Sequence, residues 1–349
     1  MVKRRVTSIE VAREAGVSRT TVSLVLNNIP DTGIPEETRR KVLETAARLN
    51  YHPNVSGRRL VSGRTHTLAL VLHQSSERAA SDHFLLQVLR GLDAVTRAND
   101  YYVLLRTVDP TQAQDGYGHL IYAGYADGII LSGPLLEEPE AVELYQNRLP
   151  IVVTGRLPGQ RVPWVDADNY QGAQQATNHL IRLGHRRIGL ITNAPRYYLA
   201  SQQRFLGYHD SLLSAGLPFD ESLVVEACFT SESGLAAMNT LLDLTRRPTA
   251  VFVASDVVAF GAMHAIRRRG WAIPQDVAIV GFDDVAMSRY VEPFLTTVRL
   301  PAYDLGWEVG QLCLQLINQE EPAALEVLLP TELVIRASCG GEAGNGNRE

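Results

Sequence analysis

Two aspartates in the second half of the chain each follow a short apolar run: Asp256 follows "AVFVAS" and Asp283 follows "VAIVGF". A pair of carboxylates could act as general acid and base, hold a metal ion, or accept hydrogen bonds from ligand hydroxyl groups. The chain has neither the closely spaced histidines of a metal site nor the serine-containing turn of a hydrolase. Carboxylates at strand ends beside aromatic rings suit carbohydrate binding. We therefore expect a binding protein without metal or cofactor, and not an enzyme.

A second group of polar residues lies near the N-terminus, where Arg19, Thr20 and Thr21 open a helical pattern, with Ser23 and Leu24 further along. An arginine there could bond guanine through two hydrogen bonds. The threonines offer hydroxyl groups to phosphate or a methyl group to thymine. These residue types at the start of a helix indicate contact with the major groove of DNA. The alternative is a helical hairpin with an incidental polar surface.

The elements that must position these residues form a helix-turn-helix pattern. Residues 9–15 have helical periodicity with Thr7 or Ser8 as a cap, Gly16 can end that helix, and Ser18 can cap the next one at 19–27. A third helix is expected from near Pro35 over residues 36–50. The apolar residues expected to point inward are Val22, Val25, Leu26, Val42, Leu43, Ala46 and Leu49.

Charge is distributed unevenly along the chain. Residues 1–66 hold 12 Lys and Arg against 6 Asp and Glu, whereas the remaining residues hold 21 against 32. A basic N-terminal part on an acidic body is what a protein that binds nucleic acid at one end would show.

Behind this head, apolar runs alternate with amphipathic stretches. The runs include "LALVL", "YYVLLRTV", "DGIILSG", "PIVVTG", "RIGLIT", "AVFVAS" and "VAIVGFDD". Buried strands separated by helices predict parallel sheets with helices on both faces, and there are enough strands for two sheets. Ligands of such folds bind outside the C-terminal ends of the strands.

Length and composition restrict the class of protein. The chain has 349 residues, of which 45% are hydrophobic and 20% charged, which is typical of globular proteins of two or three domains. We find neither an apolar run of about 18 residues that could span a membrane nor a signal peptide. Three distant cysteines, Cys228, Cys313 and Cys339, argue against a zinc site or disulfides and fit a cytoplasmic protein.

An ordered set of motifs resembles the lactose-repressor (LacI/GalR) family of transcription regulators. The motifs are "VTSIEVAREAGVSRTTVSLVLNN", "PEETRRKVLETAARLNYHPN", "LGHRRIGLI", "GFDD" and "LTTVRLP", and they extend over nearly the whole chain. The resemblance implies an α-helical helix-turn-helix head and an α/β periplasmic-binding-protein-like body of two doubly wound subdomains. Its implied ranges are 1–50 for the head, 51–66 for the hinge helix and linker, 67–165 with 299–326 and 166–298 with 327–340 for the subdomains, and 341–349 for a disordered tail.

By the same resemblance, paired hinge helices enter the minor groove of DNA and a leucine, here Leu60, separates two base pairs. Gly57 replaces the usual alanine and should cost the hinge helix roughly 0.5–1 kcal/mol. Leu24 stands where many relatives have an arginine, which moves base reading to Arg19 and Thr20. The expected DNA-binding residues are Thr7, Ser18, Arg19, Thr20, Thr21, Ser23, Leu24, Asn27, Tyr51, Asn54, Arg58, Arg59 and Leu60.

The resemblance also implies a small-molecule effector in the cleft between the subdomains. Arg204 matches the family's arginine that bonds effector oxygens, and Asp283 matches a carboxylate that accepts from ligand hydroxyl groups. Phe229 lies where relatives place an aromatic platform. The expected effector-binding residues are His73, Asp82, Phe84, Arg204, Phe229, Ser255, Asp256 and Asp283, and Trp164, Tyr197 and Tyr198 could also line the cleft.

We therefore expect a cytoplasmic repressor of carbohydrate uptake or breakdown genes, whose affinity for double-stranded operator DNA changes when a sugar binds. The alternatives are a nucleoside- or purine-responsive regulator on the same scaffold and a free-standing solute-binding protein, which the head disfavours. Because the tail after Ile335 lacks leucine heptads, we expect a homodimer rather than a tetramer. The sequence does not decide whether the effector releases or promotes DNA binding.

Overall fold

The computed structural model describes residues 6–26, 32–51, 63–76, 79, 82–108 and 116–341. The chain divides into two compact units, Met1–Thr65 and His66–Glu349. The head unit contains α1 (Ser8–Ala15), α2 (Arg19–Leu26) and α3 (Glu36–Arg48). Among the described residues no helix is long and apolar enough to cross a membrane.

The head is stabilised by residues that cap its helices and by the apolar helix faces that pack together in its core. Thr7 and Glu10 make a reciprocal capping box at the start of α1, and Gly16 ends that helix in the left-handed conformation (φ 70°). Val11, Val22 and Val42 are completely buried where the three helices meet. Leu43 was expected in this core, but its side chain is 47% exposed. Position 43 lies a quarter turn away from the face that buries residues 42 and 46.

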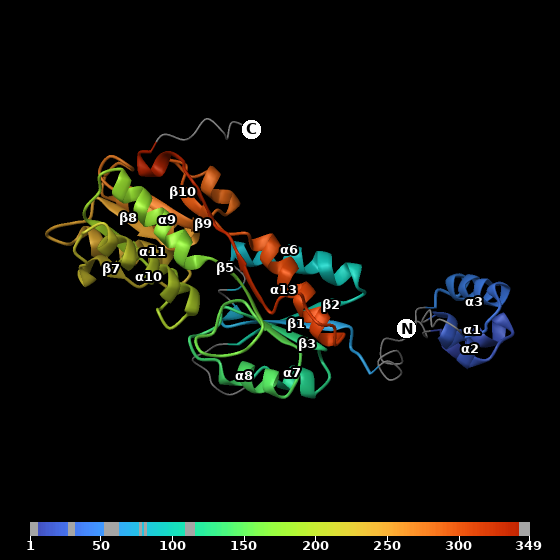
Figure 1. Cartoon of the computed structure of the whole chain (residues 1–349). Coiled ribbons are helices and arrows are strands. Elements are labelled where there is room, and N and C mark those ends of the chain that lie inside the picture. Colours follow the sequence, from blue (N-terminus) through green and yellow to red (C-terminus); the bar gives the residue numbers. More distant parts are fainter. Residues whose placement is uncertain are drawn as a thin grey trace. The chain divides into compact units, whose positions relative to one another are not determined.

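The body contains two six-stranded sheets (Figure 1). The first has the order β11-β5-β4-β3-β1-β2, and all its strands are parallel. Its strands are β1 (Thr67–Leu72), β2 (Tyr102–Thr107), β3 (Gly128–Ser132), β4 (Ile151–Val153), β5 (Trp164–Ala167) and β11 (Glu326–Leu329). The helices packed on its two faces are α6 (His83–Ala98) with α13 (Ala302–Ile317), and α7 (His119–Tyr122) with α8 (Pro139–Gln146).

The second sheet has the order β12-β10-β9-β8-β6-β7, in which only β12 is antiparallel to its neighbour. Its strands are β6 (Ile188–Ile191), β7 (Val224–Val225), β8 (Ala250–Val253), β9 (Ala278–Asp283), β10 (Thr296–Arg299) and β12 (Glu332–Val334). The helices are α9 (Asn169–Arg182), α10 (Leu199–Ser214), α11 (Ser231–Leu242) and α12 (Asp256–Arg268), with short 3-10 turns η1 (Glu221–Leu223), η2 (Ala286–Arg289) and η3 (Ala337–Cys339).

Alternate residues of the central strands face opposite helical layers. In β1, Leu68, Leu70 and Leu72 pack against α6 and α13, whereas Ala69 and Val71 pack on the opposite face. Helices α6 and α13 cross closely at Gly306. Glycine permits this approach, since a Cβ atom at position 306 would collide with the carbonyl oxygen of Val88. The predicted fold class, a helical head and a body of two parallel α/β sheets, is thus confirmed.

The chain crosses between the two sheets three times: after β5, after β10 and between β11 and β12. All three crossings lie slightly later than the subdomain ranges expected from the sequence. Residues 166–167 stay in the first sheet as the end of β5, and residues 327–329 stay there because β11 pairs with β5 along its whole length. Residue 299 stays in the second sheet as the end of β10. Strand pairing, which has no local sequence signal, sets these limits.

Candidate functional site

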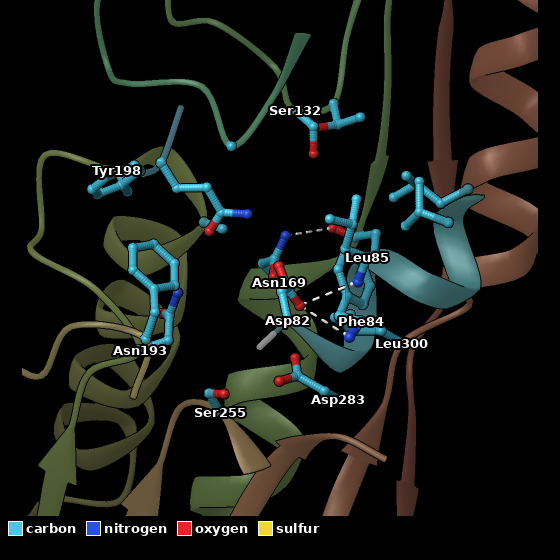
Figure 2. Close-up of a pocket in the computed structure, with 18 of the residues that line it drawn as sticks. Asp82, Phe84, Leu85, Ser132, Asn169, Asn193, Tyr198, Ser255, Asp283 and Leu300 are labelled. Atoms are coloured by element: carbon cyan, nitrogen blue, oxygen red, sulfur yellow. Dashed lines mark hydrogen bonds between the residues drawn. The ribbon is translucent and has the colours of Figure 1, made fainter. Parts of the chain in front are cut away.

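The strands of both sheets end at one cavity in the body (Figure 2). The cavity and its opening to solvent together hold about 1140 Å³ of space between the lining atoms. Polar residues that follow strand ends line it: His73 and Gln74 after β1, Ser132 of β3, Thr154 after β4, Asp166 of β5, Asn193 after β6, Ser255 after β8 and Asp283 of β9. The ends of parallel strands are where α/β folds bind ligands.

Arg204 on α10 organises the polar side of the cavity. Its Nε donates a hydrogen bond to Asn169 Oδ1 (2.9 Å), and its Nη1 donates to the carbonyl oxygen of Ala254 (2.5 Å). The same Nη1 lies 3.6 Å from Asp283 Oδ1, and the guanidinium stacks 3.9 Å from the ring centre of Phe282. Only 6% of the residue is exposed. Burial therefore lowers its pKa, against the opposing charges of Asp283 and Asp166.

Two lining carboxyl groups are shifted by their surroundings. Burial raises the pKa of Asp166 to about 7, although Arg204 and a hydrogen bond from Asn169 Nδ2 (3.1 Å) favour its ionised form. Burial also raises the pKa of Asp283, to about 6, and the nearby guanidinium of Arg204 opposes that shift. Asp283 has a positive φ of 119°, as does Phe229 at 60°. Strained backbone of this kind gathers at binding sites.

Part of the lining is apolar, with Phe84, Leu85 and Leu300 lying together in Figure 2. Asp82 lies beside them and caps α6, because its Oδ1 accepts hydrogen bonds from the backbone N–H groups of Phe84 (3.0 Å) and Leu85 (3.1 Å). A ligand in the cavity would therefore meet both acceptor groups and an aromatic and aliphatic surface.

Hydrogen bonds between residues 134–136 and residues 197–199 join the two subdomains beside the cavity. Leu136 N donates to the carbonyl oxygen of Tyr197 (2.9 Å), and Leu199 N donates to that of Pro134 (3.1 Å). The hydroxyl group of Tyr198 donates to the carbonyl oxygen of His73 (3.1 Å). The ring of Tyr198 meets that of Phe229 edge to face, with 5.3 Å between centres. Tyr198 thus lines the cavity, whereas Tyr197 and Trp164 lie outside its lining.

Asp256 does not line the cavity, which corrects the expectation from the sequence. It is the first residue of α12 and completely buried, and its two carboxylate oxygens accept hydrogen bonds from Thr297 Oγ1 (2.6 Å), Ser288 Oγ (2.7 Å) and Val285 N (3.0 Å). Burial and the charge of Asp283 raise its pKa. Ser255, one residue earlier, faces the cavity, because successive residues at the start of a helix point in different directions.

The head presents a separate polar surface at the start of α2. Arg19 and Thr20 are exposed, and the Arg19 Nε donates to Ser8 Oγ (3.2 Å). Ser18 caps α2, because its Oγ accepts from Thr21 N (3.0 Å) and bonds Thr21 Oγ1 (2.9 Å). Ser23 and Leu24 are half-buried, Thr7 belongs to the capping box of α1, and Tyr51 packs against the head core. Asn27, Asn54, Arg58, Arg59 and Leu60 lie outside the described residues.

Comparison with known proteins accounts for both surfaces. Residues 9–54 match the model of the bacterial regulatory proteins of the lacI family, and residues 177–339 match that of a periplasmic binding protein-like domain. The HTH-type transcriptional regulator CelR of Thermobifida fusca is 34% identical over 339 residues, which cover 96% of this chain and 99% of CelR. The chain belongs to the LacI family.

Other LacI-family members are similar over the same length. Catabolite control protein A of Priestia megaterium is 34% identical over 337 residues, covering 95% of this chain and 99% of that protein. A solved complex of CelR with cellobiose matches with a TM-score of 0.71 and 34% identity, over 96% of this chain and all of that one. The lac repressor dimer bound to operator and the anti-inducer ONPF matches with a TM-score of 0.83 and 27% identity, over 96% and 99%.

The predicted family is thus confirmed, and the protein is a DNA-binding transcriptional regulator rather than an enzyme. Sequence reasoning on this LacI-family chain missed several polar residues of the cavity, among them Asp166, Asn169 and Asn193. A usable signal was present, since each of them lies at or just after the end of a buried strand, in "WVDADN" and "IGLITN".

Proposed function

We propose that the protein binds operator DNA as a homodimer through its head, and that a small sugar bound in the body cavity changes its affinity for that DNA. The regulated genes would be those of carbohydrate uptake or breakdown. The observation that carries the proposal is that the linked polar residues Asp283, Asn169 and Arg204 line the same cavity as the aromatic ring of Phe84.

This arrangement suits a sugar because carboxylate and amide oxygens accept hydrogen bonds from hydroxyl groups, while a ring face covers the C–H surface of a pyranose. A planar nucleobase would be better held between two parallel rings. The described lining offers Phe84, Tyr198 and Phe229, of which Tyr198 and Phe229 are in contact with each other at 88°. The solved complex of the relative CelR with cellobiose also supports a sugar.

For the DNA side, we propose that Arg19 and Thr20 read base edges and that Ser18 and Thr21 contact phosphate. Both groups lie at the start of α2, the element that helix-turn-helix proteins place in the major groove. Two heads of a homodimer would contact adjacent major grooves about 34 Å apart. The relative solved as a dimer on operator DNA supports this assembly.

Coupling between the two surfaces requires only that the sugar bind one arrangement of the subdomains more tightly than another. The cavity has residues of both subdomains on its walls, such as Asp82 and Asp283, so its shape depends on their relative orientation. We propose that a sugar contacting both walls selects one orientation and thereby changes the geometry at the start of the body, where the linker to the head is attached.

The first experiment is a thermal unfolding screen of the full chain against monosaccharides, disaccharides, sugar phosphates and nucleosides. A ligand at 100 times its dissociation constant stabilises the folded state by about 2.7 kcal/mol, which raises the unfolding midpoint by a few degrees. A sugar that does so, and then changes the affinity for operator DNA in a fluorescence anisotropy titration, supports the proposal. A response to nucleosides alone would replace the sugar with a nucleoside effector.

A further inference from the structure

We propose that the cavity accepts only effectors without a negative charge, and that Asp82 and Asp283 exclude acidic sugars. This inference rests on the proposed function, because it takes the cavity to be the effector site. It goes further by naming the charge class of the effector and the residues that select it.

The described lining residues carry an excess of negative charge. They include the carboxyl groups of Asp82 and Asp283, and that of Asp166, which is only partly ionised near pH 7 because burial raises its pKa. Against them stand one guanidinium, that of Arg204, and one imidazole, that of His73. Asp82 and Asp283 are close enough for the charge of Asp82 to act on Asp283. A carboxylate or phosphate brought into this cavity would meet like charges in a site with little water, where repulsion is stronger than in bulk solvent.

The positive groups are already engaged by the protein. The guanidinium of Arg204 donates to Asn169 and to the carbonyl oxygen of Ala254, lies 3.6 Å from Asp283, and stacks on Phe282. An anion could form a two-pronged pair with it only by displacing these contacts. His73 Nδ1 lies 2.9 Å from Glu138 Oε1, and both side chains are buried. A charge on that imidazole would therefore be balanced by Glu138.

An independent sign comes from Asn193. This residue lines the cavity, is only 8% exposed, and its Oδ1 is buried without a hydrogen-bond partner in the protein. A buried acceptor of this kind costs free energy unless a donor reaches it. At Asn193 the cavity thus offers an acceptor, which a hydroxyl or ammonium group satisfies. An anionic group would add a further acceptor.

The test is isothermal titration of the full chain with matched pairs that differ in one charged group, at constant pH and ionic strength. The pairs are glucose and glucuronate, galactose and galacturonate, cellobiose and its aldobiuronic acid, and uridine and uridine monophosphate. We expect the neutral member of any pair that binds to bind at least tenfold more tightly than the acidic member. An acidic member that binds as tightly as its neutral partner would overturn the inference.

Two substitutions identify the cause. Asp82→Asn removes one charge from the cavity but keeps an oxygen that can accept from Phe84 N and Leu85 N, so α6 stays capped. Asp220→Asn is the matched control, since Asp220 caps the short turn η1 in the same way, by accepting from Ser222 N, and does not line the cavity. Asp82→Asn should reduce the neutral-to-acidic preference severalfold, and Asp220→Asn should leave it nearly unchanged.

The result separates this inference from the proposed function. If uridine binds tenfold more tightly than its monophosphate and none of the sugars binds, the sugar proposal fails while the charge rule stands. If a sugar binds but its uronate binds equally well, the sugar proposal stands and the charge rule fails. Equal effects of Asp82→Asn and Asp220→Asn would also overturn the role given to the cavity carboxylates, and an absence of binding in every pair would overturn both proposals.

Discussion

The hydroxyl group of Tyr198, at the start of α10, donates a hydrogen bond of 3.1 Å to the carbonyl oxygen of His73, which follows β1 in the other subdomain. Tyr198→Phe removes this bond and should lower the free energy of unfolding by about 1 kcal/mol. It should also weaken effector binding, because the arrangement that holds the effector loses a cross-subdomain contact. Urea denaturation and calorimetric titration would measure both effects.

The control for this prediction is Tyr197→Phe. The ring of Tyr197 stacks on Tyr198, but the residue is 48% exposed and does not line the cavity. Its substitution should change stability and effector affinity little. Identical behaviour of the two variants would contradict a specific role of the Tyr198 hydroxyl group.

Arg204→Ala should leave the operator affinity of the effector-free protein intact and abolish its response to the effector. The substitution deprives Asn169 and Asp283 of their partner and leaves Asp283 as an uncompensated carboxylate, which should cost about 3 kcal/mol of stability. Anisotropy titrations with and without effector test the response. Arg186→Ala, at an exposed turn, is the matched control. A variant at Arg204 that still responds fully would remove this residue from the effector site.

Asp256→Ala should act on stability and hardly on effector affinity. The substitution leaves Thr297 Oγ1, Ser288 Oγ and Val285 N without their acceptor in a fully buried position. We expect a loss of about 3 kcal/mol or more in denaturant unfolding. Effector affinity measured well below the lowered midpoint should stay within a few-fold of the original value. A selective loss of effector binding with unchanged stability would contradict this prediction and assign Asp256 to effector binding.

Asp166 should make stability depend on pH. Its pKa is raised from an ordinary 3.8 to about 7 in the folded protein, so between these values the folded state keeps a proton that the unfolded state has lost. The contribution of this group to the free energy of unfolding therefore falls as the pH rises, by at most about 1.4 kcal/mol per pH unit, and levels off above the folded pKa. Asp166→Asn carries no such proton. The difference in free energy of unfolding between the variant and the original protein should grow from about pH 5 to about pH 7. If the free energies of unfolding of the two proteins changed in parallel with pH, the raised pKa of Asp166 would be contradicted.

Leu60→Ala should weaken specific operator binding far more than non-specific DNA binding, because an apolar wedge contributes only where the DNA bends around it. Leu60 lies outside the described residues, so this prediction rests on the sequence. Leu43→Ala provides a control with the same change of side chain on the exposed face of α3. Equal losses of specific and non-specific affinity in the Leu60 variant would exclude the wedge.

Much of the fold was predictable because apolar periodicity reports burial directly. The runs that became β1, β3, β8 and β9 are buried along nearly all their length, as their lack of alternation indicated. The edge strands β7, β11 and β12 were not predicted. They have two to four residues each, and their half-exposed side chains give no clear pattern. Their existence depends on pairing with distant strands.

Residues of the candidate site were predictable where a polar or aromatic residue follows the end of an apolar strand in the sequence. All of the proposed effector residues except Asp256 line one cavity, although their role in binding stays a prediction. The sequence could not separate Ser255 from Asp256, because which of two adjacent side chains faces the cavity depends on the direction of the turn before α12. It also gave no sign that Arg204 is held by Asn169 and Ala254, since those contacts join three separate segments.

The three passages of the chain between the two sheets mean that neither half of the body is a continuous stretch of the gene. The first sheet receives β11 and the packing helix α13 only after β10 of the second sheet has been made, and the second receives β12 last. During synthesis on the ribosome, both halves therefore remain unfinished until nearly the whole chain has emerged. A premature stop codon before α13 would leave both halves incomplete, and the head would be released attached to a body that cannot fold.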